Sequence, residues 1–145
     1  MTQRFHPSLF QRAVLGLSAV LALWIGAQGL FAPDAFMAAL GLSIDNPGGR
    51  NEVRAQYGSY FVLLALLWIG GAVGRIRTST ALMVLAVLYV GVLSGRLMSL
   101  GLDGFAVFGT YPDVIQRVHG IDAVGAAITL LALRTADRPR PSERG

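Results

Sequence analysis

Side chains that could carry acid–base or anion-binding chemistry interrupt otherwise apolar stretches of this chain. His119 and Asp122 are three positions apart, which places them on one face of a helix. A carboxylate beside an imidazole orients the ring and favours its protonated form, so this pair could transfer protons. Arg96 interrupts another apolar run, where its guanidinium could hold an anionic group.

A second polar group is the segment from residue 51 to 58, which reads NEVRAQYG. Glu52 could act as a further general acid or base, Arg54 could bind a phosphate or carboxylate, and Tyr57 could position a substrate. Gln28, near the end of the first apolar run, is a further candidate ligand contact. Each has a structural alternative, because acids favour the first helical turn, and Arg and Tyr favour membrane interfaces.

The elements that must position these groups are four apolar runs. Hydrophobic residues make up 54% of the 145-residue chain and charged residues only 14%, whereas soluble domains carry about 25% charged residues. A membrane-spanning helix needs about 20 apolar residues. Four runs meet this requirement: Ala13–Phe31, Ala55–Val73, Thr80–Leu100 and Val114–Leu133. We therefore predict an all-α integral membrane four-helix bundle, with residues 1–136 as its single domain.

The arginines predict the orientation of the bundle. All twelve basic residues are arginines, and most flank the same ends of the predicted spans: Arg4, Arg12, Arg75, Arg77, Arg134, Arg138, Arg140 and Arg144. The positive-inside rule then puts both termini in the cytoplasm. The first apolar run exceeds the 7–15 residues of a signal peptide, so we expect an uncleaved span. The tail 137–145 is rich in Pro and Arg and is expected to be disordered and cytoplasmic.

The link between the first two spans predicts a short helix on the outer membrane surface. Phe36, Met37 and Leu40 recur at helical spacing after Pro33, and Gly41 suits a helix end. The residues 46–49, which read NPGG, are expected to form a turn. Two small-residue pairs, Gly70/Gly74 and Gly91/Gly95, either let helices approach closely or are simply tolerated in lipid.

The depth of the charges predicts a pocket. With this orientation, every charged group within the spans lies in the outer half of the membrane, where each costs about 2.5–3.5 kcal/mol unless it is paired or hydrated. We expect a polar pocket between helices two, three and four that opens outward. Arg96 would pair there with Glu52 or Asp122. A purely structural network, with Asp122 neutralising Arg96 and His119 in the headgroup layer, is equally compatible with the pattern.

The segment 51–58, followed one span later by Gly95 and Arg96, resembles a bacterial family of small four-helix membrane proteins, the domain of unknown function 4345 type. That family carries an NExRAxYGG-like stretch at the start of its second helix and an arginine in its third. The resemblance extends from Leu15 to Leu133. Ser59 stands where the second glycine is usual, which implies a looser helix contact. The resemblance implies a multi-pass protein of the bacterial cytoplasmic (inner) membrane and supplies no activity.

Several function classes are disfavoured by the sequence. The arginines sit at the ends of apolar segments and form no stripe along one face, so no nucleic-acid binding is expected. The chain has no Cys and only two His, and it lacks a nucleotide-binding fingerprint. We therefore expect no metal, haem or other cofactor.

Two functional hypotheses remain open. In the first, the pocket binds a lipophilic small molecule and isomerises, opens or cyclises it, with Glu52, His119 and Asp122 handling protons. In the second, the chain is a non-catalytic accessory subunit of a larger membrane complex, or packs against a second copy. The lipid bilayer is a partner in both. A proton-coupled carrier is disfavoured because the inner half of the spans lacks a polar path.

Overall fold

The computed structural model describes residues 6–104 and 113–136, with the backbone alone for Asp103 and residues 113–119. Within these ranges the chain is all-α and contains no strand. The elements are α1 (Leu9–Phe31), α2 (Pro33–Ala39), α3 (Pro47–Val53), the π-helix η1 (Arg54–Ser59), α4 (Tyr60–Ala72), α5 (Thr78–Asp103) and α7 (Asp113–Arg134). The predicted tail 137–145 lies outside the described residues.

Three described helices are long and apolar enough to cross a membrane: Leu9–Phe31, Pro47–Ala72 and Thr78–Leu102. The second of these is one continuous rod made of α3, η1 and α4. The first, third and fourth predicted spans lie within α1, α5 and α7. The rod contains the second span except for Val73, which is the C-cap of α4, and it begins eight residues before that span, at Pro47. These three helices have the length and composition of membrane spans, as the hydropathy of the sequence predicts.

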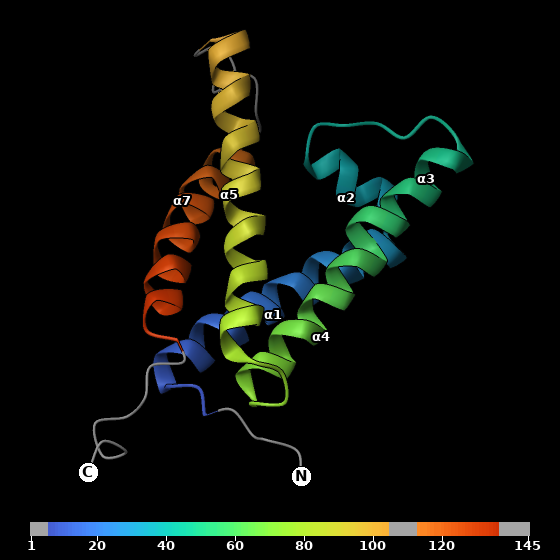
Figure 1. Cartoon of the computed structure of the whole chain (residues 1–145). Helices are drawn as coiled ribbons and strands as arrows, with labels where there is room; N and C mark the ends of the chain where they lie inside the picture. The colour runs from blue at the N-terminus through green and yellow to red at the C-terminus, as the bar shows by residue number, and fades with distance from the viewer. Residues whose placement is uncertain (1–5, 105–112, 137–145) are drawn as a thin grey trace, which may run out of the picture.

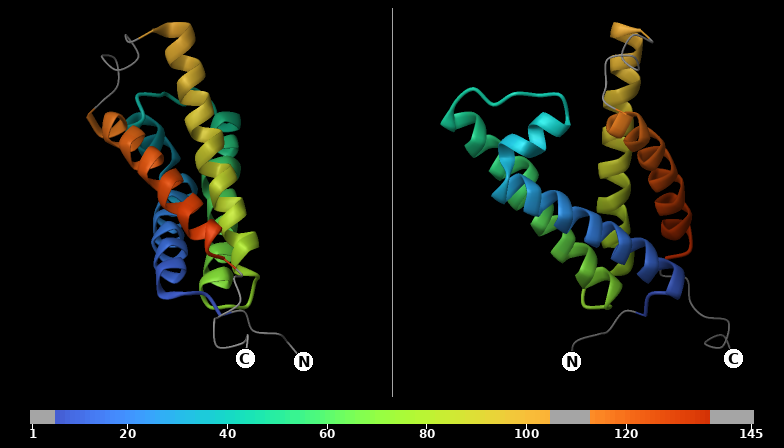
Figure 2. Two further views of the ribbon diagram at one scale, coloured as in Figure 1. Left: turned by 60° about the vertical axis from the view of Figure 1, so that its left-hand side comes forward. Right: turned by 180° about the vertical axis from the view of Figure 1, so that it is seen from behind.

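The helices meet at one end of the molecule and separate at the other (Figure 1). We call the meeting end the base: α1 and α5 begin there, and α4 and α7 end there. At the opposite, far end, α3 and η1 lie well away from the outer part of α5, as the view from behind in Figure 2 also shows. The molecule therefore consists of a pair formed by α1 and the α3–η1–α4 rod, and a second pair formed by α5 and α7.

The base is held together by a small apolar core. Leu15, Ala65 and Leu82 are completely buried, and Trp68 is 2% exposed. Gly71 permits α4 to approach α5 closely, because an added Cβ would collide with the Cβ of Ala81. Such burial of α1, α4 and α5 against one another holds the two helix pairs together at the base.

The link between α1 and α3 is only partly as predicted. The short helix is confirmed, with Pro33 in its first turn and Gly41 in a left-handed conformation at φ 75° just beyond it. The predicted turn at residues 46–49 is wrong, because α3 begins at Pro47. The Asn46 side chain accepts a hydrogen bond from the Gly49 amide at 2.9 Å, so Asn46 is a helix N-cap. The second membrane helix consequently starts earlier than its apolar run.

The two helices of the first pair cross at glycines. A Cβ added to Gly29 would lie 2.7 Å from the backbone nitrogen of Gly58, and one added to Gly58 would lie 2.7 Å from the Leu30 side chain. The predicted pairs play no such role among the described residues: Gly91 and Gly95 have no described atom within 4 Å of an added Cβ, and Gly70 faces Ile76 of the following loop. Close packing thus occurs at Gly58, the first glycine position of the NExRAxYGG-like stretch. Ser59, at the second glycine position, is exposed.

Candidate functional site

An ion pair joins the two helices of the second pair. Arg96 Nη2 on α5 lies 2.7 Å from Asp122 Oδ2 on α7, with side-chain exposures of 25% and 13%. Of the two partners that the sequence offered for Arg96, Asp122 is the one that the structure brings to it. Because a largely buried charge among apolar helices is costly when it is unpaired, the pairing explains how both charges are tolerated.

Tyr89 connects this ion pair to α1. Its ring packs on Gly125, where an added Cβ would lie 2.5 Å from Tyr89 Cζ. The hydroxyl groups of Tyr89 and Ser18 lie close together, and Asp122 is near enough for its charge to act on the Tyr89 hydroxyl. Tyr89 is therefore the point at which α1, α5 and α7 share polar contacts.

A cavity of about 670 Å³ lies beside Tyr89, between α1 and α7. Its volume falls in the range of small-molecule sites, about 300–1,000 Å³. Most of its wall is apolar, and the hydroxyl-bearing residues Ser18, Tyr89 and Thr129 supply its polar groups. The lining residues are Phe10, Ala13, Val14, Leu17, Ser18, Tyr89, Gly120, Ile121, Val124, Gly125, Ile128 and Thr129. The cavity runs from about the level of the ion pair toward the base.

Hydrogen bonds tie α1 to α7 at the base end of this cavity. Gln11 Nε2 donates to the Ala132 carbonyl and to Thr135 Oγ1, both at 3.4 Å. Gln11 is 4% exposed, so these bonds are shielded from the surroundings. A buried polar group needs such partners, and here they fix the distance between the ends of the two helices.

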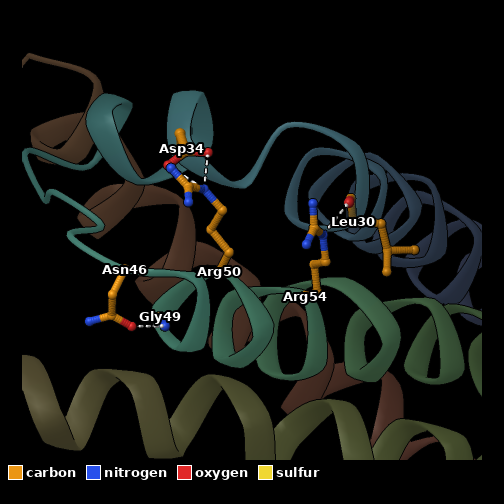
Figure 3. A network of polar contacts seen from close by, with 6 residues as sticks. All are labelled: Leu30, Asp34, Asn46, Gly49, Arg50 and Arg54. Carbon is orange, nitrogen blue, oxygen red and sulfur yellow. Dashed lines mark hydrogen bonds and ion pairs between the residues drawn. The ribbon is translucent and has the colours of Figure 1, made fainter.

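The second polar group surrounds the start of the α3–η1–α4 rod (Figure 3). Arg54 Nε donates to the Leu30 carbonyl at 3.2 Å, which satisfies one of the free carbonyls at the end of α1. Arg50 Nε lies 2.8 Å from Asp34 Oδ2, and this hydrogen bond holds the pKa of Asp34 below its usual value. These contacts fasten α2 and the end of α1 to the rod.

The predicted site residues therefore fall into two separate groups. Glu52 is exposed on α3 and accepts a hydrogen bond from Gln56 at 3.5 Å. Tyr57 lies in η1 with its ring 5.5 Å from that of Phe36, and Gln28 is half-buried on α1. These residues, like Arg54, belong to the first helix pair. Arg96 and Asp122 belong to the second, on the far side of the gap between α3 and α5 (Figure 1).

One predicted proton-transfer partner lies where the structure gives only the backbone. His119 is on α7, three residues before Asp122, and its side chain is among those that the structure does not describe. No three His, Asp or Glu side chains gather around a metal-sized space in the described part of the chain.

Sequence reasoning overlooked Tyr89, Ser18, Thr129 and the crossing glycines. A usable signal existed for Tyr89, because it is seven residues before Arg96 and therefore on the same helix face. Gly125 is likewise three residues after Asp122, on the face that meets α5. The signal for the crossing was the closely spaced pair Gly26 and Gly29 on α1, which both approach Gly58.

The chain matches the family model described as a domain of unknown function (DUF4345) over residues 10–111. It belongs to the DUF4345 family. The match covers α1 to α5 and includes both the segment 51–58 and Arg96. It ends before α7, so it is shorter than the resemblance to Leu133 inferred from the sequence, and Asp122 lies outside it. No curated protein and no solved structure matches the chain.

Proposed function

We propose that this DUF4345 protein is a four-helix protein of the bacterial inner membrane with its base toward the cytoplasm. Support for α7 as the fourth span comes from its 22 residues and from its pairing with α5. Support for the orientation comes from the described arginines at the base, Arg12, Arg75, Arg77 and Arg134. The short helix α2, fastened by Asp34 and Arg50, would then lie at the outer surface.

The proposed function is to bind a lipophilic small molecule that has a polar head. The observation that carries the proposal is the Arg96–Asp122 ion pair beside a mainly apolar cavity of about 670 Å³. An ion pair offers both a donor and an acceptor to a polar head, and the cavity offers space for an apolar body. The polar head would lie at the ion pair, at the end of the cavity farther from the base.

Acid–base chemistry is within the reach of this arrangement. The Asp122 carboxylate would take a proton from the ligand and return it at another atom, and the Arg96 guanidinium would stabilise negative charge that develops on the ligand. His119, one turn away, would share the proton. Such proton movement leaves the ligand's oxidation state unchanged, as in an isomerisation, a ring opening or a cyclisation. The other predicted site residues lie on the first helix pair, away from Asp122, and have no direct part in this proton transfer: Glu52, Arg54, Tyr57 and Gln28.

The alternative is an accessory subunit of a larger membrane complex or a homo-oligomer. The outer half of α5 favours it, since Leu97 and Met98 are each 67% exposed and Gly91 and Gly95 leave open space for another helix. In that case the Arg96–Asp122 ion pair would only stabilise the contact between α5 and α7 and would bind no ligand.

The test compares Asp122→Asn with the control Asp34→Asn, which breaks an exposed ion pair elsewhere in the chain. Each protein is extracted in mild detergent, its folded fraction is measured by size-exclusion chromatography, and its retained lipids by native mass spectrometry. The proposed function predicts that Asp122→Asn stays folded but loses lipid species that the wild type and Asp34→Asn retain. Loss of folded Asp122→Asn protein, no retained lipid in the wild type, or a stoichiometric protein partner would favour the alternative.

A further inference from the structure

The exposure and polarity of the residues that line the cavity between α1 and α7 indicate which kind of molecule occupies it. Leu17 is 73% exposed, Val124 59% and Ile121 51%, and all three line the cavity. The cavity therefore opens sideways, through apolar side chains, in the middle of two membrane helices. The medium outside such an opening is hydrocarbon, so an occupant arrives from the bilayer and not from water.

The cavity is elongated along the helix axes. Its lining extends on α7 from Gly120 to Thr129 and on α1 from Phe10 to Ser18. These segments correspond to about 13.5 Å and 12 Å at 1.5 Å per residue. The Gln11 hydrogen bonds join α1 to α7 at the base, so the elongated space ends there. A chain entering from the level of the ion pair would point toward the base.

The polar groups of the wall are distributed unevenly. The neighbouring hydroxyls of Tyr89 and Ser18 lie toward the far end, next to the charge of Asp122. Nearer the base, Thr129 is the polar member of a lining otherwise made by Phe10, Val14 and Ile128. One end of the space thus suits a polar group and the remainder suits methylene groups.

We infer that the cavity holds the single hydrocarbon chain of a lipid, its first polar group beside Tyr89 and Ser18 and its tail directed toward the base. The inference rests on the proposed function, since it assigns the tail of the same ligand whose head meets Arg96 and Asp122. It names the ligand class as a single-chain amphiphile. A rigid, compact ligand would leave the base end of the cavity empty.

The experiment uses palmitic acid that carries a diazirine near mid-chain as the probe. The purified full-length protein in detergent is irradiated with a small molar excess of the probe, and the labelled peptides are identified by mass spectrometry. We expect the label to concentrate on residues 10–18 and 120–129. The exposed apolar residues of α5 near Met83 and Val87 serve as an internal reference for unspecific labelling.

Matched variants separate the cavity from the rest of the lipid-facing surface. Val124→Trp fills the cavity, whereas Leu131→Trp alters a residue of α7 with a similar exposure of 54% that does not line it. We expect Val124→Trp to reduce labelling of the two segments by at least about fivefold, since the indole occupies the volume of the chain, and Leu131→Trp to leave it unchanged. Ala13→Leu, which fills the cavity from α1, repeats the test if Val124→Trp does not fold.

Equal labelling of the cavity segments and the α5 reference would overturn the inference, as would full labelling of folded Val124→Trp or Ala13→Leu. The Asp122→Asn variant distinguishes a failure of the tail assignment from a failure of the proposed function. If the tail assignment is wrong but the proposed function is right, Asp122→Asn still changes the retained lipids. If only the head assignment is wrong, labelling of residues 10–18 and 120–129 persists in Asp122→Asn.

Discussion

The two helix pairs are built by different means. In the first pair, α1 crosses the α3–η1–α4 rod at Gly29 and Gly58 with almost no room between the backbones. In the second pair, α5 and α7 are joined by the Arg96–Asp122 ion pair and by Tyr89, and a cavity of about 670 Å³ remains beside them. Close packing gives the first pair rigidity, whereas the second keeps charge and space, which are what a ligand requires.

The difference also assigns roles to the two polar groups. The polar side chains of the first pair are used in fastening, as when Arg54 binds the Leu30 carbonyl and Arg50 binds Asp34. Those of the second pair lie next to the cavity. A structural role for the first group and a binding role for the second can be tested by changing one residue at a time.

The largest effect is expected at the glycine crossing. In Gly29→Ala the added Cβ would lie 2.7 Å from backbone atoms of Gly58 and Tyr57, which cannot move without separating the helices. We expect a loss of about 3 kcal/mol in the free energy of unfolding. Denaturant titration in detergent, followed by circular dichroism, measures it.

Gly91→Ala is the matched control for this prediction. Nothing lies within 4 Å of a Cβ at Gly91, so the substitution should be neutral or slightly stabilising, because alanine is the better helix former. Equal destabilisation by both substitutions would mean that the crossing of α1 and η1 is no tighter than the rest of the molecule.

The next largest effect is expected for the ion pair. A double-mutant cycle of Arg96→Gln and Asp122→Asn should give a coupling free energy of about 1–3 kcal/mol, since each single variant leaves one charge unpaired in an apolar setting. Thermal unfolding of the two single variants and the double variant measures this coupling. A coupling near zero would contradict the contact between α5 and α7 on which the site depends.

A smaller effect is expected for Tyr89→Phe. This substitution removes the hydroxyl that lies close to that of Ser18 and should cost about 1 kcal/mol of unfolding free energy. Tyr60→Phe, which alters a residue that is 51% exposed, should change stability little. If the two variants behave alike in chemical denaturation, Tyr89 does not connect α1 to the second pair.

The smallest effect is a pH dependence at the far end. The Asp34 pKa lies below its usual 3.8 because of the hydrogen bond from Arg50. The contact between α2 and α3 is thus fully present above pH 3.8 and is lost as the pH falls through the lowered pKa. Hydrogen exchange of α2 should increase over that range in the wild type and be insensitive to pH, after correction for intrinsic rates, in Asp34→Asn. A wild-type α2 with no such change would contradict the ion pair.

What the sequence predicts well is local. Hydropathy located the apolar runs of α1, α5 and α7 to within a few residues, because a spanning helix needs an uninterrupted apolar stretch. For the rod it found η1 and α4 but not α3. The start of α3 was missed because Asn46-Pro47-Gly48-Gly49 contains turn-forming residues, although Asn before Pro is equally an N-cap signal. The π-helix at residues 54–59 has no signal in hydropathy at all.

The candidate site is less predictable, because it depends on how helices lie side by side. From their predicted depth in the membrane, Glu52 and Asp122 were equally suitable partners for Arg96. The structure decides between them, because α7 lies beside α5 whereas α3 lies away from it (Figure 2). The cavity was missed for the same reason, since Ser18 and Gly125 are unremarkable in their own helices. The order of residues in one sequence does not show which small residues on different helices will face each other.

A density map of the protein in lipid nanodiscs would show directly whether a lipid chain occupies the cavity beside the Arg96–Asp122 ion pair. We expect continuous, chain-like density between α1 and α7 that ends beside Tyr89, with Arg96 and Asp122 in contact. A map in which α1 and α7 close onto each other, leaving no such density, and in which Arg96 and Asp122 point apart into the lipid, would contradict it.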